Sequence, residues 1–311
     1  MDLLAVEGLG LRRGGAWHLR GVSLEVRPGE AWGVVGESGA GKTTLMHLVL
    51  GLLEPTEGSV RLKGEPWSGI PEKVRRPRRP VLQAVFQDPL ASLPPHLTGW
   101  QILVEPLEIH RRGDARARRE AAAAMAERVK FPESALDQRP GAWSGGLAQR
   151  LAVARALMLD PALLVLDEPL SALDPTLGGH LLELLLELRA AGTALLFVSH
   201  DLPAVARLCD RVLVLYGGEA MVQGPAAALL AGLRHPYLKG LWEAVPSLER
   251  PGAPRRWGVE AVREDVAGAC RLYPRCPSAS DACLAAPPFG EALRCHHPDL
   301  EPGGGPGPSL P

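Results

Sequence analysis

The sequence predicts an α/β fold whose core is a parallel sheet, and three observations support this prediction. A glycine-rich segment at 36–43 follows a short apolar run at 31–35 and precedes a helical pattern. Two more short apolar runs, at 163–166 and 194–199, each follow a helical pattern. Short continuous apolar runs of this kind are typical of parallel strands that helices cover on both faces.

The composition limits the class of protein. A chain of 311 residues can bury a core without disulfides. Its 34 Lys and Arg nearly balance its 35 Asp and Glu, so the net charge gives no reason to expect a nucleic-acid partner. No apolar stretch approaches the roughly 18 residues of a membrane-spanning helix, and the start lacks a signal-peptide pattern. We therefore expect a cytoplasmic chain that does not cross a membrane by itself.

The chain is expected to begin with strands. Residues 5–35 contain short strand patterns with a turn at 27–30, and their last five residues are the candidate for a buried strand. After the glycine-rich segment, residues 44–53 carry apolar side chains at helical spacing. The predicted order here is strand, loop, helix.

A basic stretch and a helical insertion follow. The arginine run at 75–79 is expected to be a solvated loop, after which the apolar run at 81–86 resumes the strands. Most of the next 50 or so residues show helical patterns, the clearest at 116–129, where alanines and paired charges favour a helix. We therefore predict an inserted helical subdomain at about 88–158.

The remainder of the core alternates helices with strands. Helices are expected at 147–158 and 180–189, each before one of the later apolar strands. After about residue 245 the composition shifts to Pro, Arg and Gly, and four cysteines follow. The predicted division is a core domain at 1–245, a cysteine-bearing extension at 246–300 and a disordered tail at 301–311.

The glycine-rich segment is a candidate phosphate site. It matches GxxxxGK[ST] and lies between a predicted strand and a predicted helix, which is the context that this motif requires. Backbone N–H groups and the helix N-terminus would face a polyphosphate, Lys42 would add a full positive charge, and Thr43 would place its hydroxyl on Mg²⁺. The candidate binding residues are Gly36, Glu37, Ser38, Gly39, Ala40, Gly41, Lys42, Thr43 and Thr44.

Two carboxylates follow the apolar run at 163–166. Parallel strands deliver the side chains at their carboxyl ends to the ligand crevice, and Asp167 and Glu168 occupy that place. Asp167 can hold Mg²⁺ directly or through water, while Glu168 can polarise the water that attacks a γ-phosphoryl group. The pair is weak evidence alone and strong evidence beside a phosphate loop.

A third motif points to a family. The segment Trp143-Ser144-Gly145-Gly146-Leu147 precedes Ala148-Gln149-Arg150, and with the motifs above the chain resembles the ATP-hydrolysing subunit of ABC transporters over about residues 1–245. The resemblance implies ATP and Mg²⁺ as ligands and a P-loop NTPase ABC cassette, with a RecA-like parallel core, an antiparallel β subdomain and an inserted helical subdomain. It also implies that Ser144, Gly145 and Gly146 reach the γ-phosphate held by a partner ATPase across a head-to-tail dimer. A serine N-cap of the following helix is the plainer interpretation of Ser144.

The same resemblance implies roles for three more residues. Gln87 is similar to the Q-loop glutamine, which senses Mg²⁺ and nucleotide and links the site to a membrane subunit. Asp174 resembles the loop that communicates across the dimer, and His200 resembles the switch histidine that contacts the γ-phosphate. The implied catalytic residues are Glu168, His200 and Gln87, and the implied Mg²⁺ residues are Thr43, Gln87 and Asp167.

The sequence departs from the family pattern at two places. Trp143 and Leu147 stand where the signature usually has leucine and glutamine, which puts the activity of the composite site that it completes in question. The residue that stacks on adenine is expected near Arg13, whereas the nearest aromatic residue is Trp17. Both remain candidates, because an arginine can also stack on a base.

Within the family, the chain resembles the ATPases of oligopeptide, dipeptide and nickel importers, in particular the second of their two ATPase subunits. This rests on the segments at 85–89, 91–93 and 105–107, on His235-Pro236-Tyr237 and on the cysteines that follow. The resemblance implies a chain at the cytoplasmic face of the membrane. Its implied partners are a second, homologous ABC ATPase in a heterodimer, two transmembrane permeases and, indirectly, an extracytoplasmic solute-binding protein.

Two alternatives remain beside peptide import. One is an importer of nickel or another small solute. The other is a soluble ABC ATPase of nucleic-acid repair or translation, which the arginine-rich stretches at 75–79 and 111–119 would support. A homodimer also remains open, and no nucleic acid is expected.

The cysteines of the extension are a candidate metal site. In a reducing compartment, four nearby cysteines suggest a metal before they suggest disulfides. Their spacing lacks the CxxC pair of common zinc sites, while Cys276-Pro277 is similar to the Cys-Pro of some cluster-binding loops. Together with the family resemblance, this favours a [4Fe-4S] cluster, with Zn²⁺ and free or disulfide-bonded cysteines as the alternatives. The ligands would be Cys270, Cys276, Cys283 and Cys295.

Overall fold

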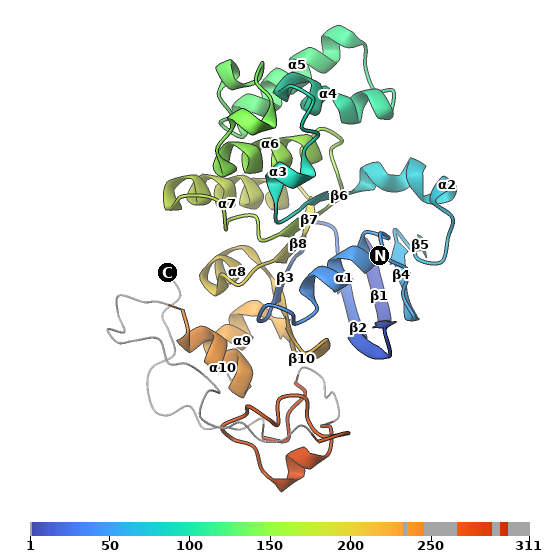
Figure 1. The fold of residues 1–311 in the computed structure, drawn as a ribbon, viewed down its shortest axis with the longest axis vertical. Helices are drawn as coiled ribbons and strands as arrows, with labels where there is room; N and C mark the ends of the chain where they lie inside the picture. Colours follow the sequence, from blue (N-terminus) through green and yellow to red (C-terminus); the bar gives the residue numbers. More distant parts are fainter. Residues whose placement is uncertain (1, 233–234, 246–265, 288–292, 298–311) are drawn as a thin grey trace.

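The computed structural model describes residues 2–232, 235–245, 266–287 and 293–297, and Figure 1 shows its arrangement. The strands are β1 (Leu4–Arg13), β2 (Ala16–Val26), β3 (Ala31–Val35), β4 (Glu57–Leu62), β5 (Glu65–Pro66), β6 (Leu82–Val85), β7 (Leu163–Asp167), β8 (Ala194–Val198), β9 (Arg211–Tyr216) and β10 (Glu219–Pro225). They form one sheet in the order β5-β4-β1-β2-β10-β9-β3-β8-β7-β6.

Helices cover the sheet and form a separate group at the top of Figure 1. They are α1 (Lys42–Val49), α2 (Glu72–Arg75), α3 (Pro89–Ser92), α4 (Gly99–Ile109), α5 (Ala115–Arg128), α6 (Gly145–Leu157), α7 (Pro175–Ala190), α8 (Leu202–Leu208), α9 (Ala226–Gly232) and α10 (Pro236–Glu243). The helices predicted at 44–53, 116–129, 147–158 and 180–189 correspond to α1, α5, α6 and α7.

The half of the sheet from β9 to β6 is parallel and buried on both faces. The strand β3 pairs with β8 and β9, and β7 pairs with β6 and β8, all in parallel. On β7, Leu164 and Leu166 belong to a hydrophobic core shared with α6, α7 and α8, whereas Leu163 and Val165 belong to a second core shared with α1. Both faces of each strand are therefore apolar, which explains the continuous apolar runs and confirms the predicted α/β fold class.

In the other half of the sheet, β5, β4, β1 and β2 pair antiparallel, and β10 joins β2 in parallel and β9 in antiparallel orientation. The strands β1 and β2 pair from Leu4↔Val26 to Arg13↔Ala16, and β4 pairs with the other edge of β1. The strands β1 and β2 have 10 and 11 residues, so the prediction of short strands at 5–35 is wrong in strand length. Register shifts interrupt β1 on both sides of Leu9. Such bulges break the alternation of apolar and polar residues from which strand length is read.

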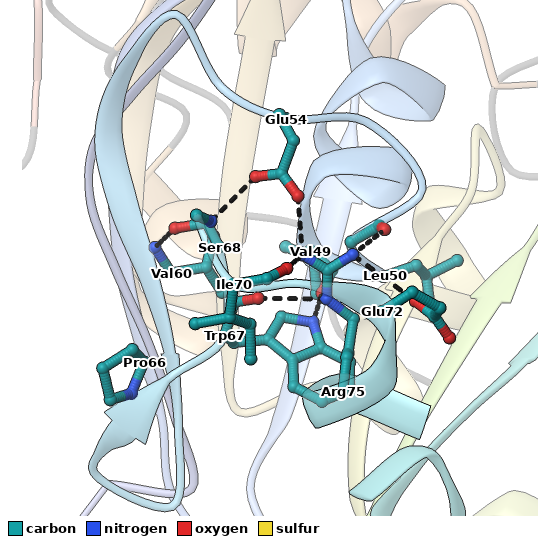
Figure 2. Close-up of polar contacts among 12 residues, drawn as sticks. Val49, Leu50, Glu54, Val60, Pro66, Trp67, Ser68, Ile70, Glu72 and Arg75 are labelled. Atoms are coloured by element: carbon teal, nitrogen blue, oxygen red, sulfur yellow. Dashed lines mark hydrogen bonds and ion pairs between the residues drawn. The ribbon is translucent and has the colours of Figure 1, made fainter. Parts of the chain in front are cut away.

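The arginine run at 75–79 is not a solvated loop, and the prediction is wrong there. Arg75 ends α2 and is only 4% exposed. Its guanidinium donates to the Gly51 carbonyl at 2.7 Å and the Trp67 carbonyl at 3.1 Å, and it pairs with Glu54 at 2.6 Å (Figure 2). These partners satisfy the buried cation. They lie 8 to 24 residues away along the chain, so the composition of the run does not show them.

The cysteine-bearing segment lies next to β10 and α10, at the bottom of Figure 1. A β-bridge joins Val222 to Leu293, and Arg294 pairs with Glu219 at 2.6 Å. Leu272 is 2% exposed and belongs to the same core as α10. The predicted tail at 301–311 lies outside the described residues. The division into domains at 245 and 300 and the subdomain limits at 88–158 stay predictions.

Candidate functional site

The glycine-rich loop connects β3 to α1. Gly36 has a φ of 152°, and a Cβ at this position would lie 2.3 Å from the Leu215 carbonyl oxygen. Gly41 has a φ of 102° and is the N-cap of α1, so the loop needs glycine at both ends. The helix begins at Lys42, and its N-terminal N–H groups and partial positive charge therefore face the concave side of the loop.

Lys42 places its ammonium group inside this loop. Its Nζ donates to the carbonyl oxygens of Gly36 at 2.7 Å and Glu37 at 3.0 Å. Burial lowers the pKa of Lys42, and the carboxylates of Glu168 and Asp167 oppose that shift. A half-buried ammonium that is held by neutral carbonyls keeps its positive charge available to a polyphosphate.

Thr43 and Asp167 provide hard oxygen atoms beside the ammonium group. Asp167, at the end of β7, is 3% exposed, and its Oδ2 accepts a hydrogen bond from the Thr43 hydroxyl at 3.4 Å. Burial raises the pKa of Asp167, and the charge of Glu168 raises it further. A hydroxyl and a carboxylate in this position fit the preference of Mg²⁺ for oxygen ligands, and a bound cation would relieve the unfavourable charge on Asp167.

Glu168 and His200 meet at the ends of neighbouring strands. Glu168 has a φ of 49°, which is left-handed backbone at a residue other than glycine. Its N–H donates to the Val198 carbonyl at 2.9 Å, and its own carbonyl accepts from the Ser171 hydroxyl at 2.8 Å. Nδ1 of His200 lies 2.8 Å from Oε2 of Glu168. The chain thus directs this carboxylate toward the cavity at the cost of backbone strain.

A cavity of about 1260 Å³ joins these groups. Lys42, Thr43, Thr44, Gln87, Asp167, Glu168 and His200 line it, as do Gly36, Glu37, Ser38, Gly39 and Gly41. Ala40 is 4% exposed within the loop, where its carbonyl accepts from Gly218 N–H at 3.1 Å. Of the two candidates for base stacking, Trp17 lines the cavity and Arg13 is not among its lining residues.

One wall of this cavity is formed by residues that the sequence did not indicate. The β9–β10 turn, the end of α10 and the cysteine-bearing segment contribute to it, through Gly217, Gly218, Leu241, Ala244, Val245 and Arg271. The Gly217-Gly218 pair could have suggested a close approach of the backbone. For the residues of the C-terminal region, no local pattern in the sequence indicates that they return to the phosphate loop.

The signature residues lie apart from this cavity. Ser144 caps α6, with its hydroxyl 3.3 Å from Leu147 N, and Gly145 and Gly146 form the first turn of that helix. None of the three lines the cavity, and neither does Asp174, which caps α7. A Cβ on Gly146 would approach Leu173 at 3.4 Å, so the two segments pack side by side. Within one chain, they form a surface separate from the phosphate loop.

Trp143 is a core residue of the helical group. Its side chain is 6% exposed, its ring contacts Phe131 edge to face at 5.4 Å, and its indole N–H donates to the Ala135 carbonyl at 3.2 Å. The departure from the family pattern at this position is therefore accommodated by packing. Trp143 itself does not point toward a phosphate.

The four cysteines of the C-terminal segment lie near one another. Burial raises the pKa of Cys276 to about 11, and the charges of Cys295, Cys283 and Cys270 raise it further. Burial also raises the pKa of Cys270. As placed, no three His, Cys, Asp or Glu side chains in the described ranges could together hold a metal ion. The donor chemistry suits a metal site, while the present arrangement is not a complete set of ligands.

Comparison with known proteins identifies two regions. The ABC transporter family matches residues 19–171, and the family described as the oligopeptide/dipeptide transporter C-terminal region matches residues 223–283. Among solved structures, a dimeric post-hydrolysis state of the ATP-binding cassette MJ0796 bound to ADP and Pi is similar, with a TM-score of 0.67 and 27% identity. That match covers 72% of this chain and 98% of the cassette. The structure of cbiO1 from Clostridium perfringens gives a TM-score of 0.66 at 27% identity, over 74% of this chain and 91% of cbiO1.

Curated relatives match along most of their length. A probable D,D-dipeptide transport ATP-binding protein of Escherichia coli, DdpF, is 37% identical over 289 residues, which cover 89% of each protein. The dipeptide transport ATP-binding protein DppF of Haemophilus influenzae is 37% identical over 293 residues, which cover 90% of this chain and 89% of DppF. In the described part of the chain, no helix is long and apolar enough to span a bilayer. The chain belongs to the ABC transporter ATP-binding proteins of the oligopeptide/dipeptide family.

Proposed function

We infer that this chain is the ATP-binding and ATP-hydrolysing subunit of an ABC importer that takes up oligopeptides or dipeptides. One observation carries the inference for the site: Lys42, Asp167, Glu168 and His200 face a single cavity at the carboxyl ends of parallel strands. That edge of the sheet is where open α/β folds bind their ligands.

Each side chain of the site has a separate role in the hydrolysis of ATP. Lys42 binds the terminal phosphates of ATP, together with the N–H groups of the loop at 36–43. Thr43, Asp167 and Gln87 would hold Mg²⁺, which would supply positive charge to neutralise the phosphates. Glu168 accepts a proton from the attacking water, and His200, at hydrogen-bond distance from that carboxylate, holds it in place and faces the γ-phosphate. Trp17 stacks on the adenine ring.

A second ATPase completes the site. The N–H groups at the start of α6 belong to Ser144, Gly145 and Gly146, none of which lines the cavity of the chain's own phosphate loop. A head-to-tail partner brings these N–H groups to the γ-phosphate of the opposite subunit, and Asp174 lies beside the same contact. The similarity to dimeric MJ0796 supports this arrangement. We propose a homologous ATPase as this partner, because the chain resembles one of the two ATPase subunits of peptide importers, and a second copy of the chain is the alternative.

A separate groove suits a membrane subunit. A cavity of about 470 Å³ lies between the sheet and the helical group, with Phe86, Leu93 and Ile109 among its lining residues. Ile109 and Leu52 on its border are about half exposed, at 52% and 50%. An exposed apolar border of this kind favours a protein partner. We propose that a cytoplasmic helix of one permease docks here, which holds the chain at the cytoplasmic face of the membrane.

The arginine-rich stretch argues against a nucleic-acid role. Arg75, Arg78 and Arg79 donate to backbone carbonyls of the chain itself, and Arg79 also pairs with Glu72 at 2.7 Å. Guanidinium groups occupied in this way are poorly available for phosphates. Import of peptides is favoured over nickel or another small solute by the family match of the C-terminal region.

For the C-terminal cysteines we propose a [4Fe-4S] cluster, with Zn²⁺ as the alternative. The proposal is supported by four cysteines in one segment, where the Cys270 N–H donates to the Cys283 carbonyl at 2.9 Å. Loading would require the thiols to move together and to lose their protons. Protein purified without oxygen is expected to contain about four irons per chain. Stoichiometric zinc in a colourless protein would establish the alternative. A protein that contains no iron and no zinc would refute the metal site.

The importer is tested by gentle affinity purification of this chain from native membranes. Two permeases, a second ATPase and uptake of labelled di- and oligopeptides by the reconstituted complex are expected. Lys42→Ala should keep the same partners and lose uptake, because it removes the phosphate-binding cation and leaves the docking groove intact. Ribosomal proteins or nucleic acid without permeases would overturn the transport role, and uptake of nickel alone would overturn peptides as the solute.

A further inference from the structure

Glu37, the second residue of the phosphate loop, is held by the C-terminal region. Nη1 of Arg275 lies 2.8 Å from Glu37 Oε2, and Nη2 lies 3.3 Å from Oε1. The Glu37 N–H donates to the Tyr237 hydroxyl at 2.8 Å. Glu37 is separated from Tyr237 by 200 positions in the sequence and from Arg275 by 238 positions. We propose that Arg275 is a positioning residue for ATP: it holds the Glu37 carboxylate away from the phosphates and from Lys42.

An acidic side chain in this loop works against the binding of a polyphosphate. Glu37 lines the same cavity as Lys42, and its charge acts on the Lys42 ammonium. An unpaired Glu37 carboxylate would repel the phosphates and compete with them for Lys42. The bidentate contact with Arg275 neutralises the negative charge of Glu37 and fixes the orientation of its carboxylate, because a guanidinium can bind both carboxylate oxygens at once.

The C-terminal region provides a built support for this contact. On either side of Arg275, Leu272 is 2% exposed and Cys276 is 6% exposed, so the backbone that carries the arginine is anchored in the core. Tyr237 is fully buried, and its ring contacts Tyr216 edge to face at 4.9 Å. The support therefore reaches the loop from two sides, at the backbone through Tyr237 and at the carboxylate through Arg275.

This inference rests on the proposed ATPase function, since it assigns a role in the nucleotide site. If Arg275 had only a structural role, loss of its ion pair with Glu37 should affect nucleotide binding no more than loss of another ion pair of the cysteine-bearing segment. Arg294 provides that comparison, because it joins the segment to Glu219 of β10 at 2.6 Å and neither residue lines the nucleotide cavity. Arg275→Gln and Arg294→Gln make the same chemical change at these two ion pairs.

The experiment is calorimetric titration of the full chain with Mg-ADP and with Mg-ATP, followed by KM and kcat for hydrolysis by the assembled complex. We expect Arg275→Gln to weaken binding and raise KM about fivefold, with kcat unchanged, because the two partly exposed charges interact by up to about 1 kcal/mol. Arg275→Lys should recover part of the affinity, since the charge remains. Glu37→Gln/Arg275→Gln should bind nucleotide more tightly than Arg275→Gln alone, because the unpaired charge is removed together with its partner. Arg294→Gln should bind nucleotide as the wild type does.

Three results would overturn the inference alone. These are wild-type affinity in Arg275→Gln, equal loss in Arg275→Gln and the double variant, or equal loss in Arg275→Gln and Arg294→Gln. The last two would mean that the arginine supports the fold of the segment and not the charge balance of the loop. Failure of the wild-type chain to bind either nucleotide would instead refute the ATPase function, so the two failures are distinguishable.

Discussion

Nδ1 of His200 lies 2.8 Å from Oε2 of Glu168, and the two side chains differ sharply in exposure. The Glu168 side chain is 10% exposed, whereas that of His200 is 71% exposed at the mouth of the cavity. Their strands, β7 and β8, are adjacent and parallel, so both side chains leave the sheet at the same edge. The buried partner is suited to accept a proton, and the exposed partner can contact a ligand that enters from outside.

Glu168→Gln is expected to abolish hydrolysis and to keep ATP binding. The amide has the same shape as the carboxylate but cannot accept a proton from water, so we expect kcat to fall by about a hundredfold or more. Phosphate release and nucleotide titration measure the two effects, and trapped ATP should accumulate in a closed dimer. Glu183→Gln is the control. Glu183 lies on α7, is about half exposed and pairs with Arg207, and it does not line the nucleotide cavity. Hydrolysis at the normal rate in Glu168→Gln would contradict the assignment of the base.

Asp167→Asn is expected to stabilise the nucleotide-free protein and to impair its response to Mg²⁺. Burial and the neighbouring Glu168 raise the pKa of Asp167, so the ionised carboxylate is unfavourable in the fold without a cation. Because this pKa is raised, ionisation costs stability as the pH rises through it, and the neutral amide removes that cost. Thermal unfolding near pH 7 should show an increase of about 2 °C. A lower melting temperature in the variant would contradict this account of the site.

Acid should destabilise the attachment of the C-terminal region through His235. Burial lowers the pKa of His235 to about 4, against 6.5 for an ordinary histidine. Its Nδ1 accepts from Tyr237 N–H at 3.2 Å, so Nε2 carries the proton and faces the Arg294 carbonyl at 3.3 Å. Between about pH 6.5 and 4 the unfolded chain binds a proton that the folded chain excludes, so stability falls as the pH falls through this window.

The variant His235→Asn tests this pH dependence. Asparagine preserves a capping acceptor at the start of α10 and does not titrate, so the melting temperature of the variant should decline less between pH 7 and pH 5 than that of the wild type. Equal declines in the two proteins would exclude His235 as the source of the acid sensitivity.

Trp143→Leu should lower the free energy of unfolding without raising the activity of the composite site that the signature completes. The change brings the residue closer to the usual family pattern, yet it empties space beside Phe131 and removes the hydrogen bond to Ala135. We expect a loss of about 2 kcal/mol in the free energy of unfolding, measured by denaturant titration. Trp17→Leu is the comparison, since Trp17 lies on the rim of the cavity and should affect nucleotide affinity instead. A rise in ATPase activity in Trp143→Leu would show that the tryptophan limits the composite site.

The chemistry of the site, and the order of the strands and helices that carry it, can be predicted from the sequence alone. A phosphate loop is contiguous, so the glycines and Lys42 of 36–43 can be read locally, and the rule for parallel strands places Asp167, Glu168 and His200 at one edge. The order of strands and helices follows from continuous apolar runs and helical spacing in the same way. These features depend on neighbours in the sequence or on a general rule of sheet geometry.

The contacts between residues that are distant in the sequence follow from the three-dimensional packing and could not be predicted. The burial of Arg75 depends on carbonyls at Gly51 and Trp67, and the contact of Arg275 with Glu37 spans 238 residues. The choice of Trp17 over Arg13 at the cavity likewise depends on how the β1–β2 hairpin lies against α1. No periodicity or motif encodes such pairs, because their energy arises from the packing of whole elements and from the satisfaction of buried charge.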